Sequence, residues 1–410
     1  MVTGNLQLTS TGSADRILTG NPQFTFFKAI YKRHTKYSTN TIEVSESTSC
    51  RFGSSVRFKI NKNGDLLKNV FLELKVNGLD QTQGGASWVG FTNSFLPSLI
   101  EHMELHINEQ RIDRINGEFL DIYNEIMLSQ GKRIAHDNMI GKYENPLAVQ
   151  TNAVNNEYTF YLPIPFWFCE NISASLPLIA LQHSDIYINI KLRESKELVK
   201  SDVQLSSITD INGKKFEIQS LKMFGNYIIL DAPERRLFAS KSHEYLITQH
   251  QNVVDYVKSG NVTKIVNLPL RHSIKYITWV IRNQFPCDTL NGNNWTNYKK
   301  TDGSNPLVTA KLKFNGMDYI NDMDTDYYTK VVPYYYFPNN PRKYINIYSF
   351  SEKPHCWKPS GHYNFDTVDD SDLILTLNEH TNNKEILVFA ENYNVLRISS
   401  GIAGLAFNNL

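Results

Sequence analysis

Short stretches of alternating polarity recur along the whole chain and constrain its fold more than any other feature. The segment KNVFLELKV, residues 68–76, places four apolar side chains on one face of an extended strand, because successive strand side chains point to opposite sides. The same alternation occurs at residues 103–107, 186–192 and 344–348. Turn residues such as the pair Asn63-Gly64 separate these segments. Many short strands with Gly, Asn and Pro turns predict an all-β sandwich or barrel.

The chain also contains an internal similarity at about half its length. LHINEQRID, residues 105–113, is similar to LKFNGMDYI, residues 312–320. HSDIYINIKL, which begins at His183, is similar to DSDLILTLNE, which begins at Asp370. Both pairs are separated by roughly half of the 410 residues, which favours a duplicated β unit of about 200 residues. We expect the join in the polar stretch 200–215.

Two segments have helical periodicity and are expected as insertions between strands. In residues 116–131 the apolar side chains follow the spacing i, i+3, i+4, i+7, with Asn116 placed to cap the start and Gly131 to end the helix. In PERRLFASKSHEYL, residues 233–246, Pro233 suits a first helical turn.

The composition excludes several classes of protein. Lys and Arg number 42 against 41 Asp and Glu, so the net charge of +1 removes the simplest argument for a nucleic-acid binder. The aromatic content of 12% favours β structure and extensive association. The four cysteines form no C-x-x-C pair and are typical of reduced thiols. Without a secretory signal or a long apolar run, we expect a soluble protein.

No catalytic or cofactor motif is present in the sequence, so we expect neither an enzyme nor a cofactor or metal site. The acidic run DMDTDYY, residues 322–328, resembles the start of a calcium loop, but Tyr327 and Pro333 stand where such a loop needs Gly and Glu. No G-x-S-x-G, P-loop or G-x-G-x-x-G motif occurs. Asn294, in the sequon Asn-Trp-Thr, is a candidate glycan site or part of an ordinary polar loop.

Seven segments together resemble the major capsid protein of the nucleocytoplasmic large DNA viruses. They occur in the order of that family from residue 18 to the C-terminus, and seven segments in order are far more specific than any one. The segments are LTGNPQFTFFKAIYKRHT (18–35), QRIDRINGEFLDIYNE (110–125), PLIALQHSDIYINI (177–190), YIILDAPERRLFASKSHEYLI (227–247), INIYSFSEKP (345–354), KPSGHYNF (358–365) and ENYNVLRISSGIAGLAFNNL (391–410).

The resemblance implies a double jelly roll, meaning two consecutive eight-stranded jelly-roll sandwiches with short inserted helices. We expect an N-terminal arm at 1–24, a first jelly roll at 25–205 and a second at 206–410. The family forms trimeric, pseudo-hexagonal capsomers of an icosahedral virion shell. The implied partners are two further copies of the chain, neighbouring capsomers, minor capsid and penton proteins and an internal viral membrane, with no specific nucleic acid. The implied location is the virion, with assembly in the host cytoplasm.

The chain departs from the family pattern at a few positions. Asn108-Glu109 stands where Gly-Gly is frequent, and His362-Tyr363 follows Gly361 where Thr-Cys is common. The loops that build the outer tower of the capsomer are short. A lower-copy capsid paralogue is therefore an alternative to the most abundant capsomer protein.

Two groups of aromatic residues are candidate assembly sites. With Asn21 as cap and Pro22 in the first turn, a short N-terminal helix would place its aromatic residues on one face and its basic residues mostly elsewhere. The aromatic residues either plug the base of the first jelly roll or, with the basic groups, contact neighbours, minor proteins or membrane head groups at the inner face of the shell. This candidate inner-face segment consists of Phe24, Phe27, Lys28, Tyr31, Lys32, Arg33 and Lys36. Tyr334, Tyr335 and Tyr336 are the candidate intersubunit aromatics, and burial of at least one is equally plausible.

Two other functions compete with the capsid hypothesis. A carbohydrate-binding or receptor-binding jelly roll would use exposed loop aromatics and would act as a monomer. A jelly-roll enzyme of the cupin type needs a His-x-His pair, and none occurs in the chain.

Overall fold

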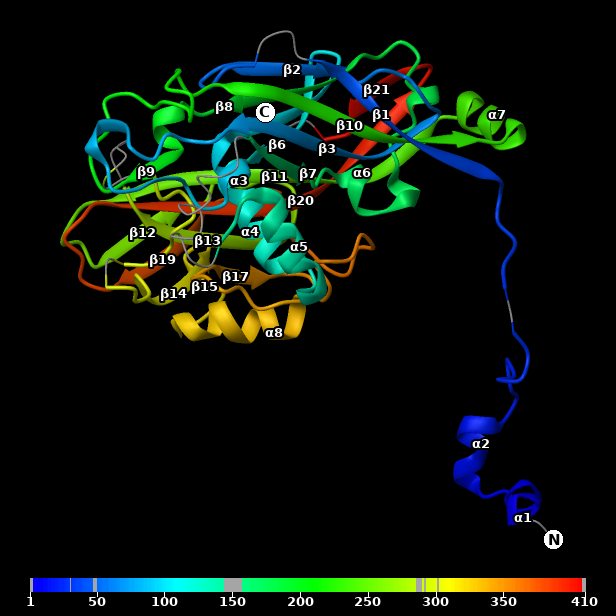
Figure 1. Cartoon of the computed structure of the whole chain (residues 1–410). Helices are drawn as coiled ribbons and strands as arrows, with labels where there is room; N and C mark the ends of the chain where they lie inside the picture. Colours follow the sequence, from blue (N-terminus) through cyan, green and yellow to red (C-terminus); the bar gives the residue numbers. More distant parts are fainter. Residues whose placement is uncertain are drawn as a thin grey trace. The chain divides into compact units, whose positions relative to one another are not determined.

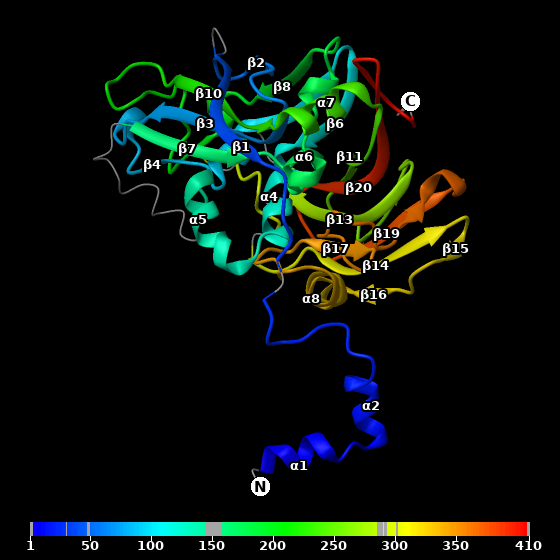
Figure 2. The same ribbon diagram turned by 90° about the vertical axis from the view of Figure 1, so that its right-hand side faces the viewer.

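A computed structural model describes residues 3–29, 31–46, 50–143, 157–284, 290, 293–300 and 302–407 (Figures 1 and 2). The chain divides into two units, Met1–Lys36 and Tyr37–Leu410. The second unit contains two β-sandwiches, one built mainly by the first half of the chain and one by the second half.

The first sandwich consists of two facing four-stranded antiparallel sheets and a small two-stranded one. The first sheet has the order β1-β10-β3-β7, the second β2-β8-β5-β6, and the third pairs β4 with β9. In β3 the side chains of Val70, Leu72, Leu74 and Val76 are buried and alternate with partly exposed neighbours, as the sequence predicts. The strands are β1 (Tyr37–Glu46), β2 (Ser55–Lys59), β3 (Leu66–Asn77), β4 (Val89–Phe91), β5 (Ile100–Ile107), β6 (Gln110–Asn116), β7 (Glu157–Pro163), β8 (Ile186–Leu192), β9 (Val199–Ser201) and β10 (Ile218–Leu230).

The second sandwich repeats this arrangement. One sheet has the order β11-β20-β13-β17, with β18 on β13 and β21 on β20, and the other has the order β12-β19-β14-β15, with β16 on β14. The all-β prediction of two jelly-roll sandwiches is confirmed. The strands are β11 (His243–Val257), β12 (Thr263–Asn267), β13 (Ser273–Asn283), β14 (Leu307–Phe314), β15 (Met317–Asp318), β16 (Met323–Asp324), β17 (Asn346–Ser349), β18 (Tyr363–Asn364), β19 (Ser371–Leu377), β20 (Lys384–Ser399) and β21 (Ile402–Leu405).

The internal similarity corresponds to equivalent hairpins in the two sandwiches. β5 pairs with both β6 and β8, and β14 pairs with both β15 and β19. The turn after β5 holds Asn108 at φ 54°, and the turn after β14 holds Asn315 at φ 50°, a left-handed conformation that asparagine tolerates well. Each asparagine donates its backbone N–H to a carbonyl before the partner strand, that of Asp185 at 2.7 Å or Asp370 at 2.8 Å.

The strand pairing bears on where the first sandwich ends. β10, residues 218–230, lies beyond residue 205, where the sequence predicts the end of the first jelly roll. It nevertheless pairs with β1 along nine positions and lies between β1 and β3 in their sheet. The polar stretch 200–215 therefore precedes a strand of the first sandwich.

Of the inserted helices, α4 and α5 lie beside the junction of the sandwiches (Figures 1 and 2). The predicted start of α4 at Asn116 is confirmed, but the helix ends before Gly131, which lies within α5. Leu128 is extended at ψ 132°, and its carbonyl accepts a hydrogen bond from Asn339 Nδ2 at 3.1 Å, so a contact from the second half accompanies the break. α7 contains Pro233 in its first turn, as predicted, and Asp231 caps it. The helices of the second unit are α3 (Phe95–Leu99), α4 (Gly117–Met127), α5 (Gln130–Ile140), α6 (Trp167–Glu170), α7 (Ala232–Ser240) and α8 (Val332–Tyr336).

The first unit differs from the sequence prediction. It contains α1 (Thr3–Thr9) and α2 (Ser13–Thr19), and no helix includes residues 20–29 or 31–36. The predicted helix after Asn21 is therefore wrong. Asn21 has φ 52°, outside the helical region, and the Thr25 hydroxyl accepts the backbone N–H of Phe27 at 3.2 Å. Such local side-chain bonds compete with a short helix that has no packed face.

Two hydrophobic cores meet at one sheet. Along β13, Tyr276 and Val280 belong to the core that continues from the first sandwich, whereas Ile277, Trp279 and Ile281 belong to the core of the second. β20 is divided in the same way. Both strands are almost entirely buried because one face of their sheet covers its own sandwich and the other covers the first sandwich.

Candidate functional site

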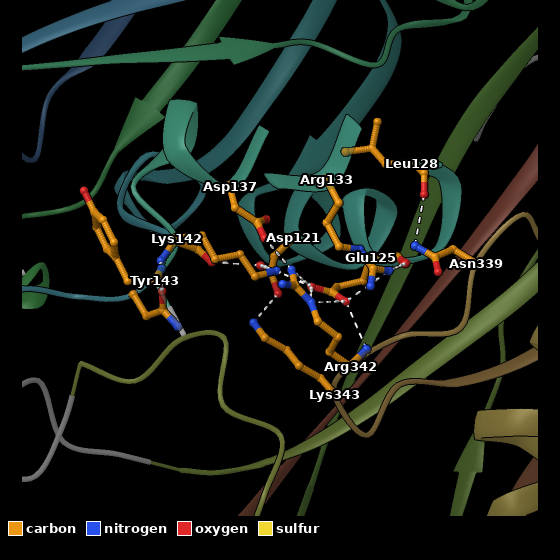
Figure 3. Close-up of polar contacts among 12 residues, drawn as sticks. Asp121, Glu125, Leu128, Arg133, Asp137, Lys142, Tyr143, Asn339, Arg342 and Lys343 are labelled. Atoms are coloured by element: carbon orange, nitrogen blue, oxygen red, sulfur yellow. Dashed lines mark hydrogen bonds and ion pairs between the residues drawn. The ribbon is translucent and has the colours of Figure 1, made fainter. Parts of the chain in front are cut away.

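The junction between the sandwiches contains a buried cluster of charges around α4, which we call the α4 cluster (Figure 3). Asp121 and Glu125 lie one turn apart on α4, with side chains at most 1% exposed. Lys142, just after α5, donates to Asp121 Oδ1 at 2.9 Å and to Glu125 Oε1 at 2.5 Å. This single lysine is shared by two carboxylates, so it neutralises only part of their negative charge.

The second sandwich supplies two further cations of the α4 cluster. Lys343 Nζ donates to Asp121 Oδ2 at 2.7 Å. Arg342 Nη2 lies 2.9 Å from Glu125 Oε1 and 2.6 Å from Asp137 Oδ2 on α5. The backbone N–H of Arg342 also donates to Glu125 Oε2 at 3.0 Å. The loop before β17 thus binds α4 and α5 through both main chain and side chains.

The electrostatics keep the α4 cluster charged near neutral pH. Burial acts to raise the pKa of Asp121, but Lys142 and Lys343 outweigh it and hold the pKa well below its usual range. Burial has the same effect on Glu125, and Lys142 and Arg342 lower its pKa to about 2. Burial lowers the pKa of Lys343 to about 8, against the attraction of Asp121. Breaking such a buried pair is costly because it leaves an uncompensated charge.

A second buried group bridges the same junction. Glu118, on α4, accepts from Arg193 at 2.6 Å and from Arg282 of β13 at 3.1 Å. Arg282 also donates to Glu385 at 2.6 Å. The Trp295 ring lies against both guanidinium groups, with centroid distances of 4.0 Å to Arg193 and 5.1 Å to Arg282.

A third group connects β6 with the central strands of the second sandwich. His250 Nδ1 of β11 lies 2.9 Å from Asp113 Oδ2 of β6. Lys275 Nζ and the Tyr276 hydroxyl each donate to Glu391, both at 2.6 Å. Three separate buried polar groups thus fix the position of one sandwich relative to the other.

The candidate inner-face segment lies in the first unit. Its aromatic side chains are exposed: 62% for Phe24, 99% for Phe27 and 80% for Tyr31. Lys28, Lys32, Arg33 and Lys36 are exposed as well. The assembly role of these residues stays a prediction.

The three candidate tyrosines lie on α8 and have two different environments. Tyr334 and Tyr335 are each 73% exposed, and their rings meet edge to face at a centroid distance of 5.3 Å. Tyr336 is half-buried against the first core. Asn294 is half-buried and lines a cleft, and its glycan stays a prediction.

The buried junction is the feature that sequence reasoning missed. The segment FLDIYNEI, residues 119–126, carries its two acids at i and i+4 within an apolar run, and this was the available signal. Within the described residues, no group of three or more His, Cys, Asp or Glu side chains is arranged to hold a metal ion. No helix of the described part is long and apolar enough to cross a membrane.

Comparisons with known proteins agree along the whole chain. Residues 25–231 match the family described as major capsid protein N-terminus, and residues 234–404 match the family described as large eukaryotic DNA virus major capsid protein. The major capsid protein of Pyramimonas orientalis virus is 32% identical, with 99% of each chain covered. That of Paramecium bursaria Chlorella virus 1 is 29% identical over the full length of both chains.

Solved structures are similar as well. The PBCV-1 virus capsid structure matches 94% of this chain and 100% of the other chain, with a TM-score of 0.80 and 25% identity. The Faustovirus major capsid protein matches 95% of each chain with a TM-score of 0.76 at 12% identity, a likeness of fold.

Proposed function

This chain belongs to the large eukaryotic DNA virus major capsid protein family, and we propose from that premise that three copies form a pseudo-hexagonal capsomer of an icosahedral shell. The observation that carries the proposal is the fixed pairing of two similar sandwiches by buried charge groups in one chain. Three such chains present six similar sandwiches around one axis. Regular packing of capsomers needs a rigid pair of sandwiches, because each capsomer contacts its neighbours through both of them.

The division of the chain follows from the strand pairing. We propose that the first jelly roll extends through β10 and that the second begins near α7. The family matches also divide there, at residues 231 and 234. The first jelly roll is therefore proposed to end about 25 residues beyond the division at 205 that the sequence predicts.

The mass of the purified protein in solution tests the trimer. Light scattering is expected to give a stable species near three times 47.2 kDa over a range of concentrations. An obligate trimer should bury on the order of 2,000 Å² or more at its subunit contacts. A monomer at every concentration would contradict the proposal.

The exposed tyrosines of α8 are proposed to lie in a subunit contact. Tyr334 and Tyr335 give a rigid apolar surface with polar ends, which is typical of interface centres. Changing both to Ser should weaken trimer association at least about tenfold. Tyr256→Ser, at a 52% exposed tyrosine of β11, is the matched control and should leave the trimer unchanged.

The N-terminal segment is proposed to connect the shell with its interior partners. Four basic residues between exposed aromatics suit acidic minor capsid or penton proteins and the anionic head groups of an internal membrane. The expected location is the virion, after assembly in the host cytoplasm. Replacing Lys28, Lys32, Arg33 and Lys36 with Gln should abolish co-sedimentation with anionic vesicles, and unchanged binding would exclude the membrane as partner.

A carbohydrate-binding or receptor-binding module is the second candidate, favoured by the exposed pair on α8. It predicts glycan binding by the monomer, lost on Tyr334→Ser. Binding in a glycan array by a protein that never trimerises would establish this candidate in place of the first.

A further inference from the structure

A cleft of about 460 Å³ opens where the two sandwiches meet, beside the α4 cluster. The first sandwich contributes Lys142 and Lys200, and the second contributes Lys299, Arg342 and Lys343. Among the described residues, the wall contains two carboxylates, those of Glu125 and Asp137. The cleft is therefore cationic.

The pairing inside the cleft leaves two of these lysines in excess. Lys142, Arg342 and Lys343 are matched by Asp121, Glu125 and Asp137 at 2.5–2.9 Å. Arg133 adds a further cation, 3.6 Å from Glu125. Lys200 and Lys299 form no ion pair with any residue that the structure describes.

Lys200 is the more informative of the two. It lies in the middle of β9 opposite Gly90 and is half-buried. Burial lowers the pKa of its ammonium group, and no carboxylate among the described residues opposes that effect. A partly buried charge without a counter-charge is unfavourable, and an anion in the cleft would supply the counter-charge.

Neutral polar groups complete the wall. The side chains of Asn294, Thr296 and Asn297 line the cleft beside Lys299. Tyr298 also lines it, and its buried hydroxyl has no hydrogen-bond partner among the described residues. The loop carrying these residues is fixed to the first sandwich, because Thr92 Oγ1 donates to the Asn293 carbonyl and Trp295 Nε1 donates to the Glu197 carbonyl.

We propose that this cleft binds a small, soluble, multivalent oxyanion of the phosphate class, held between Lys200 and Lys299. Lysine ammonium groups bind phosphate as point charges, and hydrogen bonds to charged groups are roughly twice as strong as neutral ones. The anion would connect β9 of the first sandwich with the 293–300 loop of the second. It would thus reinforce the junction from outside the α4 cluster.

Calorimetry on the full-length protein with tripolyphosphate at low ionic strength tests the site. We expect saturable binding of about one anion per chain, weakened about tenfold or more by Lys200→Gln or by Lys299→Gln. Lys258→Gln, at an exposed lysine outside the cleft wall, is the matched control and should bind as the unmodified protein does. Absent binding, or equal binding by the double variant Lys200→Gln/Lys299→Gln, would overturn the proposal.

Thermal unfolding separates a ligand site from a packing role. Without anion, Lys200→Gln should unfold at the same temperature as the unmodified protein or higher, because it removes an uncompensated charge. With tripolyphosphate, the unmodified protein and Lys258→Gln should gain more stability than Lys200→Gln or Lys299→Gln. A variant destabilised equally with and without anion would show a packing role for Lys200 and overturn the proposal. Binding to phosphoinositide vesicles without binding of tripolyphosphate would also overturn it, since the lipid head group would then be the ligand.

Discussion

Asp121 and Glu125 are buried carboxylates whose cations come from both sandwiches. Both are ionised near neutral pH because Lys142, Arg342 and Lys343 surround them. Their contribution is therefore to hold one arrangement of the sandwiches, since any displacement would leave a charge unpaired in a low-dielectric interior.

Replacing Lys142 with Met should destabilise the protein by about 3 kcal/mol or more, because two buried carboxylates lose a shared cation. Urea unfolding followed by circular dichroism measures the change. Lys330→Met is the control, since Lys330 and Asp326 form an exposed pair on the surface, and it should cost less than about 0.5 kcal/mol. Equal losses for the two variants would contradict the role of the α4 cluster.

The His250–Asp113 pair should make stability depend on pH. Burial acts to lower the pKa of His250, but Asp113, with Glu391 and Glu170, raises it above its ordinary value of about 6.5. A raised folded-state pKa gives stability that is fully present below about pH 6.5 and is lost as the pH rises through the folded value. The destabilisation caused by His250→Gln should therefore be larger at about pH 6 than at about pH 9.

Urea unfolding at both pH values measures this difference. The variant His362→Gln, at an exposed histidine, controls for the general effect of pH on the molecule. A His250→Gln effect that is independent of pH would mean that the imidazole acts through packing, for instance against the Phe119 ring at 4.8 Å.

At the scale of elements, α4 begins unusually close to a neighbouring strand. A Cβ atom on Gly117 would lie 2.0 Å from the Ile100 carbonyl oxygen and 2.3 Å from that of Pro97. Both are backbone atoms, so the contact has no flexible side chain to relax it. The close approach brings Glu118 and Asp121 to the junction.

Two glycine substitutions test this packing. Gly117→Ala should destabilise the protein by about 3 kcal/mol or more, because the clash involves backbone on both sides. Gly131→Ala, in α5 with no atom within 4 Å of the added Cβ, should stabilise it by about 0.5–1 kcal/mol. Urea unfolding measures both variants, and a tolerated Gly117→Ala would show that α4 can shift away from β5.

The sequence predicts an element well where neighbouring residues determine its structure, and poorly where residues far apart in the chain determine it. Alternation in β3, the start of α4 after Asn116 and the repeated hairpins were predictable from neighbouring residues. The α4 cluster was not, because Lys343 and Asp121 are 222 positions apart and nothing local pairs them. The prediction of a helix after Asn21 was wrong for the opposite reason: the local periodicity was present, but no other part of the chain that the structure describes packs against that face.

At the scale of the molecule, the first 36 residues and the rest of the chain are separate units. Removing residues 1–36 should change the unfolding free energy of the remainder by less than about 0.5 kcal/mol, since α2 has no buried residue. Light scattering should show that the truncated protein still forms trimers. Electron micrographs should show few complete shells. Normal shells would exclude an assembly role for this segment.

The order of strands in the first sheet also determines how long β1 waits for its partner strand during synthesis. β1 is hydrogen-bonded to β10, and 171 residues lie between Glu46 and Ile218. A ribosome adding about 5–20 residues per second makes that interval last roughly 10–35 s. Throughout it, the earliest strand to emerge presents unsatisfied backbone groups that can pair with other nascent chains. The supply of host chaperones that shield this strand during translation would therefore set an upper limit on the yield of capsid protein, before any two subunits associate.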